Sequence, residues 1–337
     1  HDTLTNCRNR NYFENYIKNH LPSSYSVLVF DLDGLKLIND AFGHLEGDRI
    51  IKQLAVFLKD IYNEAEFIAR IGGDEFALVT KDIDAKHVTD KVNELEDAIE
   101  LFNIHSSIEM NVSKCGKVVI NNEMSFEKAF IQAENKMYRR KLNNRKSRKF
   151  KVLNSIIETL NAKTEETYEH SERVGRLAVC TIKALGKSRA SELEDIELLA
   201  KVHDIGKITI ADSILKKPAA LSHEEFEIVK KHCETGYKII RNITDSDDVC
   251  NGVLFHHERF DGTGYPQGLK GDNIPLFARV ISVVDSYDAM THDRVYRKKT
   301  SKDKAIDELI RCAGTQFDPQ VVKAFLSNCL HYETDKI

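Results

Sequence analysis

The sequence predicts two domains, an α/β domain followed by an all-α helical bundle. Residues 25–32 (YSVLVFDL) are rich in β-branched and aromatic types, which is typical of a buried strand. From Lys151 onward, segments such as HSERVGRLAVCTIKAL repeat apolar residues with a period of about 3.6, which indicates amphipathic helices. A chain of 337 residues is long enough for two domains that each bury a core.

The composition is that of a folded protein with no general attraction to polyanions. Hydrophobic residues make up 42% and charged residues 30%, and the net charge of −4 gives no electrostatic reason to bind nucleic acid or an anionic membrane. No apolar run approaches the roughly 18 residues that span a membrane, and no signal peptide opens the chain. We therefore expect a cytoplasmic protein without direct membrane contact. The abrupt start at DTLTN suggests that an upstream sensory domain is missing.

The seven cysteines are odd in number and scattered, with no CxxC pair. Reduced thiols are the simplest interpretation of this pattern in a cytosolic protein.

The first domain alternates strand and helix patterns. The strand at 25–32 leads through Asp31 and Asp33 to a helix pattern, RIIKQLAVFLKDIY. Two short strand patterns, EFIARI and EFALV, are joined through Gly72 and Gly73, and this pair indicates a hairpin because the favoured turns need positive φ. The remaining elements are helix patterns over 85–103 and 125–142 and strand patterns near 108–121.

Carboxylates and glycines gather where these strands end. Asp31 ends the apolar strand, and Asp74 and Glu75 follow the two glycines. Magnesium takes few protein oxygens together with phosphate oxygens, and glycine lets a backbone approach a phosphate closely. A polar hairpin tip is the alternative for the letters GGDE alone, but Asp31 favours a magnesium–nucleotide site.

The motifs RIGGDEF and FDLDGLKLINDAFGHLEGD, preceded by DTLTNCRNR, resemble the GGDEF diguanylate cyclases over about residues 2–146. The resemblance implies that the domain binds GTP with Mg²⁺ and that two GTP molecules condense to cyclic di-GMP across a homodimer. It implies Mg²⁺ held by Asp31, the Leu32 carbonyl and Asp74, with Asp74 helping to deprotonate the attacking 3′-hydroxyl and Glu75 as a supporting acid. The implied nucleotide contacts are Asn39 and Asp48 for the guanine edge, and Lys36, Gly72, Gly73, Lys141 and Arg145 for the phosphates.

This sequence departs from the cyclase pattern at two places. Asn63 and Glu66 occupy the positions of an inhibitory RxxD product site, so we expect weak feedback inhibition at most. Asn6, Cys7 and Arg8 stand where Gly, an apolar residue and Pro are usual. Neither change touches the nucleotide site, so two alternatives stay open: an active cyclase, or a non-catalytic GTP-binding regulatory module.

A basic segment connects the two domains. Eight of the thirteen residues from Arg139 to Lys151 are Lys or Arg, and only Phe150 offers the aromatic interleaving that nucleic-acid binding would need. We expect a solvated, continuous or nearly continuous linker helix over about 140–160, with domains at 1–145 and 146–337.

The second domain carries a set of metal-ligand residues. His203 and Asp204 close an apolar, helix-like run, where a carboxylate is costly unless a cation meets it. Glu166 and His170 are four residues apart and so share a face of any common helix. Further donors follow at His232, His256, His257 and Asp285. Nitrogen and oxygen donors without thiolate suit iron, manganese or zinc, and several carboxylates favour more than one ion.

The motifs HDIGK, HHE and DGTGYP closely resemble the HD-GYP phosphodiesterases over about residues 150–328. The resemblance implies hydrolysis of cyclic di-GMP, to pGpG or GMP, at two or three ions, with iron or manganese favoured over zinc. The implied ligands are Glu166, His170, His203, Asp204, His232, His256, His257 and Asp285, with Asp204 bridging two ions. Lys207 would hold a phosphate oxygen or the leaving group, Arg294 and Arg297 would grip phosphate, and Tyr265 with Pro266 would shape the loop.

Two further expectations remain. The loop at 256–276 of the second domain is so long that it must be pinned or act as a lid. Five histidines elsewhere in the chain are expected to lack partners: His44, His105, His223, His292 and His331. A cyclic-dinucleotide sensor or scaffold without turnover is the remaining alternative for the whole chain, although a sensor has no need for eight metal donors.

Overall fold

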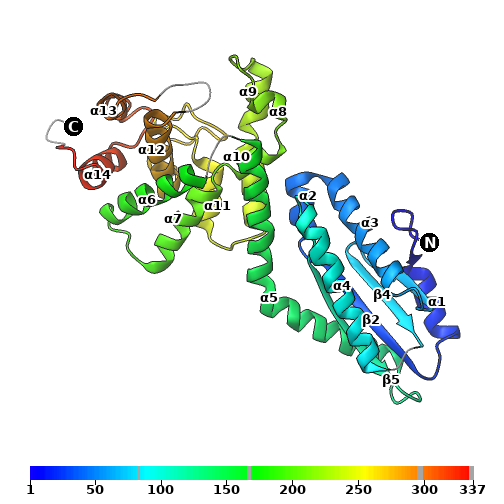
Figure 1. Cartoon of the computed structure of the whole chain (residues 1–337). Helices are drawn as coiled ribbons and strands as arrows, with labels where there is room; N and C mark the ends of the chain where they lie inside the picture. The colour runs from blue at the N-terminus through cyan, green and yellow to red at the C-terminus, as the bar shows by residue number, and fades with distance from the viewer. Residues whose placement is uncertain (82–83, 165–167, 294–298, 334–337) are drawn as a thin grey trace. The chain divides into compact units, whose positions relative to one another are not determined.

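The computed structural model describes the chain except residues 82–83, 165–167, 294–298 and 334–337, and describes no side chains over 138–150 or at Tyr168. The chain forms two compact units, residues 1–155 and 156–337 (Figure 1). The domain limits expected from the sequence stay a prediction. Among the described residues, no helix is both long and apolar enough to cross a membrane.

The first unit is the predicted α/β domain. Its strands form one five-stranded sheet in the order β1-β3-β4-β2-β5, with β1 parallel to β3 and the other pairs antiparallel. The strands are β1 (Arg8–Asn9), β2 (Tyr25–Leu32), β3 (Phe67–Arg70), β4 (Glu75–Thr80) and β5 (Val112–Val119). The helices are α1 (Arg10–Asn19), α2 (Leu35–Phe42), α3 (His44–Ile61), α4 (Ala85–His105) and α5 (Phe126–Lys163).

Strand β2 is buried along its whole length because both of its edges pair and both of its faces are covered. On one face Val27 packs with Phe13 of α1 and Phe126 of α5. On the other face Phe30 meets Tyr62, just after α3, edge to face, and α2, α3 and α4 lie along this side (Figure 1). A strand covered on both faces is mostly apolar along its length. This agrees with the β-branched and aromatic residues from which a buried strand at 25–32 was predicted.

The hairpin between β3 and β4 forms as expected, but its turn differs from the expectation. Neither Gly72 nor Gly73 has a positive φ. Space is instead tight at Gly72, since a Cβ there would lie 2.6 Å from Oε2 and 3.2 Å from Cβ of Glu75.

Helix α5 is continuous from Phe126 to Lys163 and includes the basic connector, as predicted.

The second unit is all-α, as predicted. Among its described residues there is no strand, and the β-type pairing is limited to the isolated bridge between Ala313 and Phe317. Its earlier elements are α6 (Tyr168–Ala184), α7 (Ala190–Val202), η1 (Ile205–Thr209), α8 (Asp212–Leu215), α9 (His223–Lys230) and α10 (His232–Arg241). Its later elements are α11 (Asp247–Phe255), η2 (Gly271–Asn273), α12 (Leu276–Thr291), α13 (Lys302–Arg311) and α14 (Pro319–Cys329). Their apolar faces bury residues such as Val174, Leu199 and Val280.

The expectation that every cysteine is reduced is wrong. Cys180 of α6 and Cys329 of α14 form a disulfide, with their Cα atoms 5.9 Å apart, although 149 residues separate them in the chain. Helix packing brings the two thiols to bonding distance, and no spacing rule reveals a pair so remote. The other five cysteines are free and buried.

Candidate functional site

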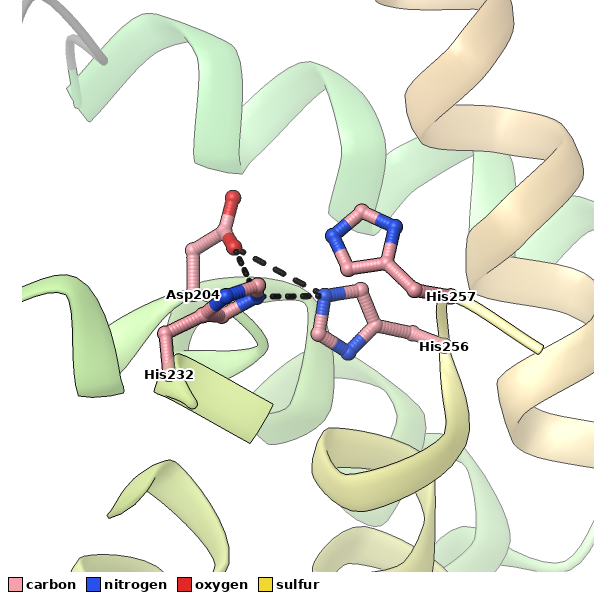
Figure 2. Close-up of side chains that lie close together, drawn as sticks. All are labelled: Asp204, His232, His256 and His257. Carbon is pink, nitrogen blue, oxygen red and sulfur yellow. Dashed lines mark hydrogen bonds and ion pairs between the residues drawn. The ribbon is translucent and has the colours of Figure 1, made fainter. Parts of the chain in front are cut away.

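Two groups of histidine and aspartate side chains lie next to each other in the second unit. One consists of Asp204, His232, His256 and His257, shown in Figure 2, and the other of His170, His203 and Asp285. Within each group the possible ligand atoms all lie within 4.8 Å of one another. The structure therefore brings together seven of the eight predicted metal donors, and the eighth, Glu166, lies outside the described residues.

Asp204 lies between the two groups. Its Oδ1 is 3.2 Å from His232 Nε2 and 3.6 Å from His256 Nε2 (Figure 2). Its Oδ2 is 3.3 Å from His203 Nε2. The two oxygens of one carboxylate thus face histidines of both groups. This is the arrangement that a bridging ligand needs.

Close packing between η1 and α10 places this aspartate. A Cβ on Gly206 would lie 1.9 Å from the backbone oxygen of His232, so only glycine permits the approach. The other donors come from the ends of elements: His203 directly follows α7, His232 begins α10, and His256 directly follows α11.

The backbone orients three of the histidines. The Nδ1–H groups of His203, His232 and His256 donate to the carbonyls three residues earlier, at 3.0, 2.6 and 2.8 Å. Because Nδ1 carries the proton in each ring, the Nε2 lone pair is available to a cation. Burial lowers the pKa of His256, and burial together with the neighbouring His256 lowers the pKa of His257 well below its usual value. Neutral imidazole is the form that binds metal.

Lys207 lies against the same aspartate. Its Nζ donates to Asp204 Oδ2 at 2.6 Å. Burial opposes ionisation of Asp204, but the ammonium group of Lys207 holds the pKa of this carboxyl well below its usual range. The site therefore contains an ionised carboxylate and a cation within direct reach of it.

Cys233 lies next to the ligand groups, with its Sγ 3.5 Å from His232 Nε2. Burial raises the pKa of this thiol. The two groups of possible ligand atoms that the structure brings together include no cysteine among the described residues, so their donors are nitrogen and oxygen, as the sequence predicted.

Asp288 is a buried site residue that the sequence analysis missed. It accepts from His170 Nδ1 at 2.7 Å and from Arg173 Nε and Nη2 at 2.7 and 3.0 Å. It turns the Nε2 atom of His170 toward Asp285, at 3.5 Å. Burial opposes ionisation, but the hydrogen bonds from His170 and Arg173 lower the pKa of Asp288. The spacing of three residues from Asp285, one face of a helix, was the available signal.

His292 was expected to lack a partner, and this is wrong. Its Nδ1 lies 3.1 Å from Asp288 Oδ1, so it belongs to the same network. The contact spans one helical turn at the end of α12.

Glu258 pins the long loop at 256–276, which was expected to be either pinned or a lid. This buried carboxylate accepts from the backbone N–H groups of Gln267, Gly268 and Leu269 at 2.7, 3.1 and 3.0 Å. The pinned loop places the Tyr265 ring 4.9 Å from the His257 ring, and burial raises the pKa of Tyr265. The predicted phosphate ligands Arg294 and Arg297 lie outside the described residues.

In the first unit, the strand end and the hairpin turn come together. Asp31 is opposite Glu75 in the register of β2 and β4, and the Leu32 N–H donates to the Asp74 carbonyl at 2.9 Å. The neighbouring Asp33 is buried and accepts from Ser113 Oγ at 3.0 and 2.9 Å. Asp33 therefore serves the fold, while Asp31, Leu32, Asp74 and Glu75 gather at one edge.

Arg70 is a second residue that the sequence analysis missed. Its Nη2 donates to the Gly73 carbonyl at 2.7 Å, and its Nη1 lies 3.2 Å from Asp2 Oδ1. It ties the glycine turn to the opening segment DTLTN.

Asn39 presents a buried acceptor. Its Oδ1 is buried and makes no hydrogen bond, and it would lie 1.9 Å from a Cβ on Gly47. Asp48, half-buried, is the next residue after this glycine, whereas Lys36 and Gly73 are exposed. The side chains of Lys141 and Arg145, on α5, lie outside the described part of the chain.

Comparisons with known proteins match the N-terminal and the C-terminal parts of the chain to two different families. Residues 1–147 match the family of the diguanylate cyclase GGDEF domain, and residues 154–321 match the HD domain. A cyclic di-GMP phosphodiesterase of Thermotoga maritima is 41% identical over 51% of this chain and 48% of its own length. The 3′3′-cGAMP-specific phosphodiesterase 2 of Vibrio cholerae is 33% identical over 52% of this chain and 34% of its own.

A solved structure that describes an interaction between a microbial GGDEF domain and cyclic di-GMP is 28% identical, with a TM-score of 0.36, over 42% of this chain and 92% of its own. The chain spans about half the length, or less, of the two curated relatives.

Proposed function

Because this chain belongs to the proteins that join a GGDEF domain to an HD domain, we propose that its HD domain is a metal-dependent phosphodiesterase that hydrolyses cyclic di-GMP. The observation that carries the proposal is the position of Asp204, whose two oxygens face both groups of histidines. The relative from Thermotoga maritima bears the name of this activity.

The donor set fits divalent cations. His232, His256, His257 and Asp204 would hold one ion, and His170, His203 and Asp285, with Asp204 as the bridge, would hold a second. Bound there, the ions would lower the pKa of a shared water and neutralise phosphate charge. Mixed imidazole and carboxylate donors without thiolate favour iron or manganese over zinc, and Glu166 is the candidate donor for a third ion.

The chain's own groups would support hydrolysis in distinct ways. The reaction adds water across one P–O3′ bond and leaves a 5′-phosphate and a 3′-hydroxyl, and a second cleavage of the linear product yields GMP. Lys207 donates to the carboxylate of Asp204, and from this position it would donate a hydrogen bond to a phosphate oxygen or to the departing 3′-oxygen. Asp288 keeps the ligand nitrogen of His170 aimed at the site.

For the GGDEF domain we propose binding of GTP with Mg²⁺ and selection of guanine. The buried, unsatisfied Oδ1 of Asn39 is an acceptor for the N–H groups of a guanine edge, and Asp48 lies close by in the sequence. Synthesis of cyclic di-GMP would need two such domains facing each other in a homodimer, since one domain supplies one GTP site. Regulation of the HD domain by bound GTP is the alternative. Because GTP and cyclic di-GMP are cytoplasmic nucleotides, we propose that the chain acts in the cytoplasm.

The substrate proposal has one specific rival. A relative named for 3′3′-cGAMP matches about half of this chain, so the second base must be determined by assay. We expect metal-loaded protein to convert cyclic di-GMP to pGpG or GMP, and product chromatography measures this conversion. The same assay is run in parallel with 3′3′-cGAMP and with GTP as the substrate. Asp204→Ala should abolish turnover while circular dichroism stays helical. Normal hydrolysis by this variant, or wild-type protein that binds no divalent metal, would overturn the assignment.

A further inference from the structure

Phe226 is an exposed aromatic residue that lies beside the metal-ligand groups. Its side chain, on α9, is 42% exposed. Its ring packs edge to face on Tyr265, with centroids 6.1 Å apart and an interplanar angle of 83°. The Tyr265 ring is in turn 4.9 Å from the ring of His257. One intervening ring therefore separates an open aromatic surface from a metal-ligand histidine.

A cation accompanies these rings. Lys230 Nζ lies 5.1 Å from the centroid of Phe226 and 5.7 Å from that of Tyr265. Phe226 and Lys230 are four residues apart and so share one face of α9. The same ammonium donates to Glu227 Oε1 at 2.6 Å, which keeps it close to the helix.

Single exposed apolar residues are common and need no explanation of their own. Ile228, on the same helix, is 41% exposed and provides such a case. It follows Phe226 by two residues, so a helix of about 3.6 residues per turn points it to the opposite side. Phe226 differs in its surroundings, because it combines an aromatic neighbour, a cation and proximity to the metal donors.

We propose that the open surface of Phe226 stacks on a purine of the cyclic dinucleotide while the phosphate lies at the metal-ligand groups. Every base has a flat π surface that stacks on an aromatic ring. The Lys230 ammonium has only donors, and guanine presents two acceptors, N7 and O6, where adenine presents N7 and an amino donor. Phe226 thus binds the base, and Lys230 favours guanine. This inference rests on the proposed phosphodiesterase activity.

The test compares Phe226→Ala, Phe226→Leu and the matched control Ile228→Ala in the metal-loaded full chain. Loss of one stacking partner should raise KM for cyclic di-GMP by about tenfold and leave kcat within about twofold, with a smaller change for the leucine variant. Inhibition by GMP should weaken by about tenfold in Phe226→Ala, whereas inhibition by ribose 5-phosphate, which lacks the base, should not change. The control should match wild type in all measurements.

Lys230→Met, with Lys231→Met as its control, tests guanine selection. The preference for cyclic di-GMP over 3′3′-cGAMP in kcat/KM should fall several-fold only in the first variant, and an unchanged ratio would overturn the role of Lys230. An unchanged KM in Phe226→Ala would overturn base stacking, and so would an equal weakening of the inhibition by GMP and by ribose 5-phosphate. The phosphodiesterase assignment stands in either case. Wild-type protein that hydrolyses no cyclic dinucleotide would overturn both.

Discussion

Replacing Asp288 by asparagine is the most informative perturbation of the metal-ligand groups. The carboxylate is buried and accepts three hydrogen bonds, one from His170 and two from Arg173. An asparagine of the same size keeps one acceptor oxygen but turns an amide donor toward one of these donors. Hydrogen bonds to charged groups contribute about 1.5–3 kcal/mol each, and breaking a buried ion pair costs about 3–5 kcal/mol.

We therefore expect Asp288→Asn to lower the free energy of unfolding by about 3 kcal/mol, measured by urea denaturation with circular dichroism. Loss of a partner that orients a ligand histidine should also weaken metal binding by about 10–100-fold, measured by competition with a chelator. Asp307→Asn, on the exposed face of α13, is the matched control and should change stability by less than about 0.5 kcal/mol.

The pKa of Asp288 predicts how this contribution depends on pH. Its pKa is lowered in the folded protein, so the stabilisation is fully present above the unfolded value of about 3.9 and is lost as the pH falls below it. The difference in stability between wild type and Asp288→Asn should shrink as the pH falls below about 4, where the carboxyl group takes up its proton. A variant that keeps wild-type stability and metal affinity would refute the reasoning.

Three further changes test the fold around each site. Gly206→Ala places a Cβ 1.9 Å from a backbone oxygen of α10, so we expect the free energy of unfolding to fall by about 1–3 kcal/mol and metal binding to weaken. An unaltered metal affinity would contradict the argument that η1 and α10 need this close approach. Replacing Cys180 and Cys329 together by serine should lower stability by about 2–4 kcal/mol, and dithiothreitol should then have no further effect on the urea midpoint. Gly47→Ala should displace the Asn39 amide and weaken GTP binding by about tenfold in calorimetry, while hydrolysis of cyclic di-GMP stays at the wild-type rate.

The sequence by itself determined the elements and most of the chemistry-bearing residues. An eight-residue segment with six apolar or aromatic residues suffices to predict β2, and the helical period suffices for the second unit, because both patterns are local. The donors His203 and Asp204 are adjacent in the chain and were identified from their position at the end of an apolar helix. Their chemistry follows from residue type, which needs no coordinates.

Tertiary packing decided which distant residues share a site. His170 and Asp288 are 118 residues apart, and Cys180 and Cys329 are 149 apart, so neither pair follows from a local period. Packing also distinguished two similar carboxylates, since Asp33 accepts a hydrogen bond from Ser113 while Asp31 lies opposite Glu75 near the end of β2. Hydrogen bonds and disulfides require atoms within a few ångströms, and at such chain separations only the folded arrangement of helices and strands sets those distances.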